Sequence, residues 1–348
     1  MINEELIRIL FLSTAAFIVA AVMTPVLTYF LYRYKLGKQI RDASEAPIYA
    51  KLHASKAGTP TMGGILIWGT ALVIICSVAV VSLLWPSVIN YNFLSRSETL
   101  LPLGALVASA LVGLVDDLFN IHKRGSHGGG LRMRHRLLVY TIIAVAGAAW
   151  FYFKLDWDVL HIPFFGNFSI GWWYIPFFIL VIVATSFSVN ETDGLDGLAA
   201  GSLVAAYLAY GVIAFLLGRY DLAVFCGVII GAMLAFLWFN IFPARFIMGD
   251  TGAMSLGVTL GIIAMLTNYA LLLPLIGFVF ALETGSALMQ MTSKFLFKRK
   301  VFLSAPLHHH LEAIGWPEPK IVMRFWIIAA VMAGLGMMLV LLDRSVVL

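Results

Sequence analysis

Aspartates recur in three separate polar segments of an otherwise apolar sequence. They are the adjacent pair in LVGLVDDLFN, two in VNETDGLDGLA and one in FIMGDTGA, namely Asp116, Asp117, Asp193, Asp196 and Asp250. Carboxylate oxygens suit Mg²⁺, which takes one or two protein carboxylates and keeps positions for water and substrate phosphates. Two adjacent carboxylates in a low-dielectric setting also need a cation to offset their repulsion. The pattern therefore favours magnesium-assisted chemistry on a phosphate group.

Each acidic segment taken alone also has a structural interpretation. Asp116 and Asp117 could mark the end of a helix and pair with Arg134 or Arg136. Asp250 could be a plain cap at the start of a helix. The recurrence of acids in three segments is what favours the chemical interpretation.

The segment VNETDGLDGLA combines polar spacing with glycines. Asn190, Asp193 and Asp196 are three residues apart and would share one face of a helical turn. Gly194 and Gly197 suit a tight turn where the backbone approaches a ligand. The alternative is an ordinary loop whose aspartate caps the following helix.

Basic and histidine residues complete the set of candidate groups. Lys56 lies in SKAGTPTMGG, where it could bind a phosphate as a point charge or merely anchor the chain at a membrane. PLHHHLE contains His308, His309 and His310; each helical step turns about 100°, so a three-histidine zinc site is disfavoured. One or two of them could contact a phosphate or orient an acid, or the run could be solvated. Glu283 is an intramembrane acid, a functional candidate or a buried partner for a polar loop.

The composition excludes a water-soluble fold. Hydrophobic residues make up 61% of the 348 residues and charged residues 12%, with a mean hydropathy of +0.95. Soluble domains carry roughly 25% charged residues. Two cysteines in apolar runs support no disulfide framework. We expect an all-α integral membrane protein that forms a single polytopic domain over residues 1–348, with the lipid bilayer and no nucleic acid among its partners.

Charge-free stretches predict about ten transmembrane helices. The first lies between Arg8 and Arg33, where 24 residues are uncharged; it is expected to be a retained helix rather than a signal peptide. The long run 251–282 is divided at Thr267-Asn268. The other expected spans are 62–85, 99–118, 137–153, 173–190, 198–217, 222–241, 254–267, 271–293 and 323–342.

The basic residues predict the orientation of these spans. With ten spans, loops 33–61, 119–136, 241–253 and 294–324 share one side and hold 18 of the 23 Lys and Arg residues. The positive-inside rule then places these loops and the acids in the cytoplasm and both termini outside. An outer segment near 154–172, with Trp157, Trp172 and Trp173, predicts a small hairpin at the interface.

Acids for magnesium, bases for phosphate and a histidine cluster on one face favour phosphoryl transfer between a soluble diphosphate donor and a lipid acceptor. The motifs SKAGTPTMGG, LVGLVDDLFN, VNETDGLDGLA, FNIFPARFIMGDTGAMSLG and APLHHHLEAIGWPEPKIVMRFW resemble those of the phospho-N-acetylmuramoyl-pentapeptide transferase family. This family belongs to the polyprenyl-phosphate N-acetylhexosamine-1-phosphate transferases. The motifs follow the family order from residue 56 to 326.

The resemblance implies a reaction and a location. Undecaprenyl phosphate would attack the diphosphate of UDP-N-acetylmuramoyl-pentapeptide, UMP would leave, and Mg²⁺ would be required. The enzyme would lie in the bacterial inner membrane as a homodimer, with its active site facing the cytoplasm and its hairpin facing the periplasm.

The resemblance also assigns site residues. Asp116, Asp117, Asp250 and His308 would be catalytic, and Asp250 would hold the metal. The positions that match substrate-binding positions of the family are Lys56, Thr61, Lys123, Arg136, Asn190, Asp193, Asp196, Asn240, Phe246, Gln290 and His309. The family usually has lysine where this chain has Asn120, and Lys123 is the expected substitute. Phe246 is the aromatic residue expected near uracil.

Three other functions compete with this interpretation. A sister enzyme would transfer N-acetylglucosamine-1-phosphate to the same lipid, but TPTMGG and PLHHHLE argue against it. A transporter or flippase would need polar residues near the bilayer midplane, where Glu283 is nearly alone. A membrane scaffold would not explain three acidic segments at one depth.

Overall fold

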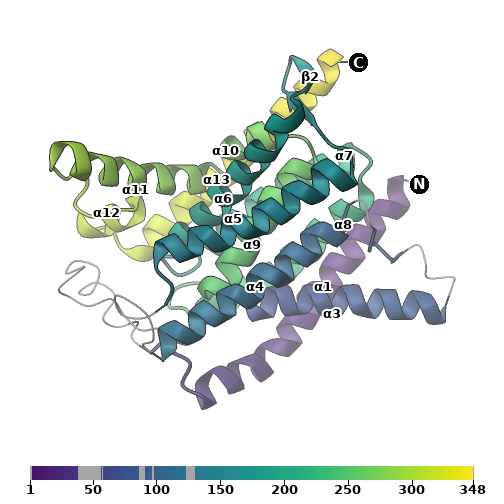
Figure 1. Cartoon of the computed structure of the whole chain (residues 1–348). Helices are drawn as coiled ribbons and strands as arrows, with labels where there is room; N and C mark the ends of the chain where they lie inside the picture. Colours follow the sequence, from purple (N-terminus) through teal and green to yellow (C-terminus); the bar gives the residue numbers. More distant parts are fainter. Residues whose placement is uncertain are drawn as a thin grey trace.

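The computed structural model of the chain consists almost entirely of helices (Figure 1). It describes residues 2–37, 56, 58–85, 91–95, 98–122 and 130–347. The uncharged stretches form helices because, in a bilayer, backbone groups must find their hydrogen-bond partners within the segment. The long helices are α1 (Ile2–Arg33), α3 (Ile65–Leu84), α4 (Leu100–Ile121), α5 (Met133–Ala149), α6 (Tyr174–Thr192), α7 (Leu198–Leu216), α8 (Tyr220–Asn240), α9 (Gly249–Leu266), α11 (Phe278–Phe297) and α13 (Glu318–Val347).

Shorter elements connect or extend these helices. They are the π-helical turn η3 (Trp150–Lys154), the 3-10 turns η4 (Gly171–Trp173) and η5 (Ala270–Leu272), and the short helices α10 (Leu273–Ile276) and α12 (Leu307–Ala313). Within the described residues, nine helices are long and apolar enough to cross a membrane, and a bent pair makes a tenth candidate. The prediction of a helical membrane protein with about ten spans is therefore confirmed.

The ninth expected span, 271–293, differs from the prediction. It is broken into 270–276 and 278–297, and the two parts meet at 83°. Gly277 lies at the bend and Pro274 lies in the first turn of α10. Glycine is a poor helix former and proline cannot donate a backbone hydrogen bond, so a straight helix does not continue through this segment. Figure 1 shows α11 extending away from the other helices.

Helix α9 forms the centre of the bundle. Every residue in it except Asp250 is buried. Its small residues allow neighbouring backbones to approach closely: a Cβ on Gly257 would lie 2.8 Å from Ser186 Cα of α6. A Cβ on Gly113 of α4 would overlap the carbonyl of Asp250. This contact fixes the end of α4 against the start of α9, where the aspartates lie.

The predicted hairpin is present. Strands β1 (Val159–Ile162) and β2 (Gly166–Ser169) pair antiparallel, with Leu160 opposite Phe168. A polar contact fixes the hairpin to the end of α13. His161 Nε2 lies 2.7 Å from Asp343 Oδ2, and the Phe164 N–H donates to Asp343 Oδ1 at 2.5 Å.

The two ends of the bundle carry different residues. We name the end that holds the hairpin the hairpin end; both chain termini lie toward it in Figure 1. Arg8 near the N-terminus pairs with Asp221 at the start of α8 at 2.7 Å. The opposite end holds Asp116, Asp193 and Asp250, and we name it the acidic end. Both termini thus lie at one end, as ten spans require.

Candidate active site

A guanidinium group joins three helices at the acidic end. Arg136 of α5 donates from Nε to Asp116 Oδ2 of α4 at 2.6 Å and from Nη2 to Asp250 Oδ2 of α9 at 2.9 Å. Its Nη1 donates to Asn190 Oδ1 of α6 at 3.1 Å, and Asn190 Nδ2 donates to Asp250 Oδ1 at 2.6 Å. Asp116 is fully buried, whereas 17% of the Asp250 side chain is exposed. Residues far apart in sequence thus form one polar cluster, named here the Arg136 cluster.

Asp117 faces a different partner from its neighbour. Its Oδ1 accepts hydrogen bonds from Thr61 Oγ1 and the Asp250 N–H, both at 3.2 Å, and its Oδ2 accepts from the Thr251 N–H at 3.1 Å. The first backbone N–H groups of a helix have no partner within that helix, and a carboxylate there is favourable. Asp117 therefore caps α9 from a neighbouring helix, and a Cβ on Gly249 would lie 2.7 Å from this carboxylate.

The segment before α3 is held against the segment before α9. Ile247 N–H donates to the Pro60 carbonyl, and the N–H groups of Gly63 and Gly64 donate to the carbonyls of Ile247 and Met248, all at 2.8 Å. These bonds place Thr61 beside the start of α9. The TPTMGG motif therefore supports the aspartates through its backbone.

The donor set of the Arg136 cluster fits magnesium. Asp116, Asp250 and the Asn190 carbonyl offer only oxygen atoms, which Mg²⁺ prefers. Across the described part of the chain, no three His, Cys, Asp or Glu side chains form an all-protein metal site. Magnesium commonly uses one or two carboxylates and completes its shell with water and phosphate.

A second ion-pair group lies at the same end of the bundle. Lys56 Nζ donates to Asp196 Oδ1 at 2.8 Å and to Glu318 Oε1 at 2.5 Å. The Asp196 N–H donates to the same Glu318 oxygen at 2.6 Å, and Asp196 Oδ2 accepts from the Ala244 N–H at 3.0 Å. All three charged side chains are largely buried. These three residues, named here the Lys56 group, hold the loop after α6 (residues 193–197) against the start of α13.

Asn240 and Phe246 lie beneath this loop. Asn240 Oδ1 accepts from the Gly197 N–H at 3.0 Å, and Asn240 Nδ2 donates to the Phe246 carbonyl at 2.9 Å. Gly197 has φ +81, a left-handed conformation that glycine adopts without strain. The Phe246 ring is fully buried against Phe236 and Phe239. In this conformation the ring is a core residue, and its contact with a base stays a prediction.

The histidine run divides into three environments. His308 and Glu283 are both fully buried, and His308 Nδ1 lies 2.9 Å from Glu283 Oε2. His309 Nδ1 lies 2.7 Å from Glu312 Oε2. His310 Nδ1 accepts from the Leu303 N–H at 3.2 Å.

The side-chain amide of Gln290 forms hydrogen bonds with the loop that follows α11. Its Oε1 accepts from the N–H groups of Val301 and Phe302, at 2.9 and 3.0 Å, and its Nε2 donates to the Phe302 carbonyl at 2.9 Å. It therefore orders the connection between α11 and α12. Its expected contact with substrate stays a prediction.

The expected residues thus fall into linked groups. The last turn of α6 and the loop after it join them, because α6 carries Asn190 of the Arg136 cluster and the loop carries Asp196 of the Lys56 group. Asp193 caps the end of α6 between them and is partly buried. Lys123 lies outside the described residues. The partnership of Glu318 with Lys56 was not predicted, although Glu318 lies within the quoted GWPEPK motif.

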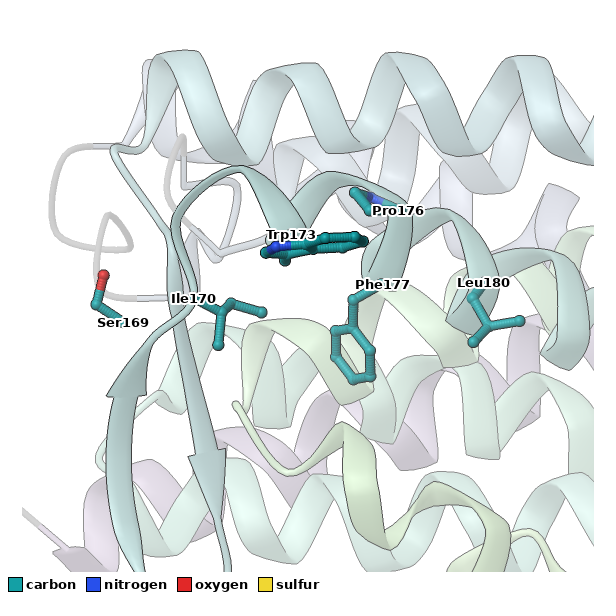
Figure 2. A pocket seen from close by; sticks show the side chains of 6 residues that line it. All are labelled: Ser169, Ile170, Trp173, Pro176, Phe177 and Leu180. Atoms are coloured by element: carbon teal, nitrogen blue, oxygen red, sulfur yellow. The ribbon is translucent and has the colours of Figure 1, made fainter.

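An apolar hollow lies at the other end of α6 (Figure 2). It is lined by Ser169, Ile170, Trp173, Pro176, Phe177 and Leu180. Trp173 and Leu180 are 76% and 65% exposed. Since these residues belong to the hairpin end and Asn190 to the acidic end, the hollow is separate from the polar groups described above.

Two family models match segments of this chain. The family described as Glycosyl transferase family 4 matches residues 99–268, which include the Arg136 cluster. The phospho-N-acetylmuramoyl-pentapeptide-transferase signature 1 matches residues 56–67, which include Lys56 and Thr61.

Relatives match over nearly the whole chain. A phospho-N-acetylmuramoyl-pentapeptide-transferase of Chloroflexus aggregans is 37% identical over 356 residues, covering 98% of this chain and 92% of the relative. Proteins of the same name from Geobacillus sp. (strain WCH70) and Desulfosudis oleivorans are 37% and 38% identical, over 97% and 94% of this chain and 98% and 90% of theirs. The chain therefore belongs to the phospho-N-acetylmuramoyl-pentapeptide-transferase family.

Proposed function

We propose that this chain transfers phospho-N-acetylmuramoyl-pentapeptide from its UDP donor to undecaprenyl phosphate, releasing UMP and forming the first lipid intermediate of peptidoglycan synthesis. The observation that carries the proposal is the Arg136 cluster, which joins Asp116, Asp250 and Asn190 at one end of a membrane bundle. Phosphoryl transfer needs positioned charge more than covalent chemistry by the protein. Family membership supplies the identity of the two substrates.

Asp250 is the residue we assign to a magnesium ion, with Asp116 beside it. Asp250 starts a helix and is the more exposed of the two carboxylates, so it is the one that water and phosphate reach. The bound ion would supply positive charge to the diphosphate. Arg136 keeps the two carboxylates together despite their repulsion, and its rigid guanidinium suits phosphate oxygens.

The two neighbouring aspartates have separate roles in this proposal. Asp116 faces the Arg136 cluster, so we assign it to orienting the phosphate of the lipid acceptor. A phosphate monoester is already largely ionised at neutral pH, so strong general-base catalysis is not required. Asp117 holds the start of α9, and with it the position of Asp250.

Lys56 and the loop after α6 bind the donor in this proposal. Lys56 is held by Asp196 and Glu318, and a lysine so placed presents a point charge to phosphate. Residues of this loop or next to it form the rest of the donor site, namely Asp193, Asn240, His308 and His309. For Lys123 and Thr61 we keep the substrate-binding role that the family resemblance implies.

We place the acidic end in the cytoplasm of a bacterial inner membrane. The support is the excess of Lys and Arg in the loops of this end, by the positive-inside rule. A homodimer follows from the family resemblance. Native mass spectrometry of the detergent-purified chain measures that state, and a monomer alone would contradict it.

A donor test decides the reaction. The purified chain receives undecaprenyl phosphate, Mg²⁺ and either UDP-N-acetylmuramoyl-pentapeptide or UDP-N-acetylglucosamine, and UMP release is measured with and without EDTA. We expect release from the muramoyl donor alone, abolished by EDTA. Release from the glucosamine donor alone would indicate the sister reaction, and no release from folded protein would contradict the proposal.

A further inference from the structure

Two buried polar side chains meet where α12 packs on α11. Glu283 Oε2 of α11 accepts a hydrogen bond from the His308 backbone N–H at 3.3 Å and lies 2.9 Å from His308 Nδ1. Both side chains have no exposed surface. An oxygen that already accepts from a backbone N–H is suited to accept from Nδ1–H as well. The proton of a neutral His308 ring is therefore on Nδ1.

The other nitrogen of the His308 ring is Nε2. Within the described residues, the buried Nε2 of His308 has no hydrogen-bond partner. Leaving a buried polar atom unpaired costs free energy, so such atoms in native proteins are often used by a ligand or in catalysis. His308 Nε2 is therefore the ring atom that remains for a substrate.

The loop after α6 lies directly over this nitrogen. A Cβ on Gly194 would overlap His308 Nε2, so only a glycine fits between the ring and the loop. Gly194 stands between Asp193 and Asp196, both assigned above to donor binding. His308 Nε2 therefore faces the loop that carries Asp193 and Asp196.

We propose that Glu283 is a positioning residue that fixes the His308 ring, so that Nε2 is directed toward the diphosphate of the donor. The inference rests on the proposed function and deepens it. A ring that carries its proton on Nδ1 presents only a lone pair at Nε2, so contact with the anionic donor requires Nε2 to take up a proton from water. The Glu283 carboxylate stabilises the imidazolium that results, as a buried carboxylate does for other functional histidines. The juxtaposition of Glu283, His308 and Gly194 carries the proposal.

The test uses the isosteric variant Glu283→Gln in the full-length chain. Glutamine keeps the size of the residue and one acceptor oxygen, so a purely structural contact with His308 would survive. We expect kcat for UMP release to fall about tenfold or more, with KM for the donor changed less than about threefold. Thr284→Val is the matched control, because it changes the next side chain of α11 without touching the pair; it should keep wild-type kinetics.

A double-mutant cycle shows whether Glu283 acts through His308. His308→Gln should slow turnover, and adding Glu283→Gln should slow it no further, because the group that Glu283 positions is already gone. Independent, multiplying losses would overturn the proposal, as would wild-type kinetics in Glu283→Gln.

A spectroscopic measurement tests the pair without activity. In ¹⁵N-histidine-labelled protein, with the His308 signals assigned by their loss in His308→Gln, we expect a protonated Nδ1 in the wild type and a changed ring state in Glu283→Gln. A neutral ring protonated on Nε2 in the wild type would overturn the proposal. If the wild type releases no UMP, the proposed function fails while this measurement still decides the role of Glu283.

Discussion

Asp117 accepts a hydrogen bond from the Thr251 backbone N–H at 3.1 Å, so a side chain at the end of α4 caps the first turn of α9. Its sequence neighbour Asp116 instead pairs with Arg136 at 2.6 Å. A helix turns about 100° per residue, so adjacent side chains on α4 point to different neighbours. The adjacent pair thus performs two tasks, one in positioning a helix and one in the candidate site.

This division predicts different effects for two matched substitutions. Asp117→Asn removes the negative charge from the start of α9 and should cost about 1–2 kcal/mol of stability. Asp116→Asn removes a carboxylate from the Arg136 cluster and should lower turnover about a hundredfold or more. Thermal melting and UMP release of both variants check this. A lower melting temperature for Asp116→Asn than for Asp117→Asn would contradict the assignment.

The Lys56 group predicts a destabilised variant that a second substitution rescues. Lys56→Met leaves the buried carboxylates of Asp196 and Glu318 without their shared cation, and breaking such a pair costs about 3–5 kcal/mol. Adding Glu318→Gln removes one of the two like charges and should recover part of the loss. Thermal melting measures both variants. Equal melting temperatures for the single and double variants would show that charge repulsion is not the cause.

Two glycines at the start of α3 predict opposite outcomes for the same change. A Cβ on Gly64 would overlap the backbone of Gly252 in α9, whereas the nearest atom to a Cβ on Gly69 is 4.0 Å away. Gly64→Ala should therefore separate α3 from α9 and reduce activity at least tenfold, while Gly69→Ala should be tolerated. UMP release and yield of folded protein check the pair. Full activity in Gly64→Ala would mean that this contact does not position Asp250.

The contact between the hairpin and Asp343 of α13 predicts a variant that is less stable but keeps its turnover. Asp343 accepts hydrogen bonds from the Phe164 N–H and the Tyr269 hydroxyl and lies beside His161. Burial and the Asp343 carboxylate raise the pKa of Tyr269, which therefore remains a hydroxyl donor. Asp343→Ala should cost about 2–4 kcal/mol, because several polar groups lose their partner.

Activity measured well below the melting temperature should change little in Asp343→Ala, because the contact lies at the hairpin end. Asp158→Ala is the matched control: its bond to Ser169 is exposed, so its melting temperature should stay near that of the wild type. A selective loss of turnover in Asp343→Ala would contradict the separation of the two ends.

Sequence patterns predicted the helices well because charge-free stretches and bilayer thickness constrain them strongly. The break at Thr267-Asn268 is confirmed, since α9 ends at Leu266 and Asn268 is left-handed. The 83° bend at Gly277 was not predicted, because hydropathy carries no information on direction. The start of α9 at Gly249 rather than 254 reflects the cap from Asp117, a contact between distant segments.

The same limit applies to the candidate site. Residue types made Asp116, Asp250 and His308 candidates, but they did not predict which partner each side chain would face. Arg136 was considered as a partner of the aspartate pair, and its bridge to Asp250 depends on the packing of α5 against α6 and α4, which the sequence does not specify. The Glu283–His308 contact likewise joins two segments that the sequence separates by 25 positions.

We propose that the phosphosugar is transferred at the Arg136 cluster. The most direct test is formation of the lipid-linked product by Asp250→Asn in nanodiscs, beside the wild type and with saturating Mg²⁺ and muramoyl donor. We predict nearly complete loss of product with an unchanged melting temperature, because the carboxylate assigned to the metal is lost while the packing of α9 is kept. Near-wild-type product formation by folded Asp250→Asn would contradict the account.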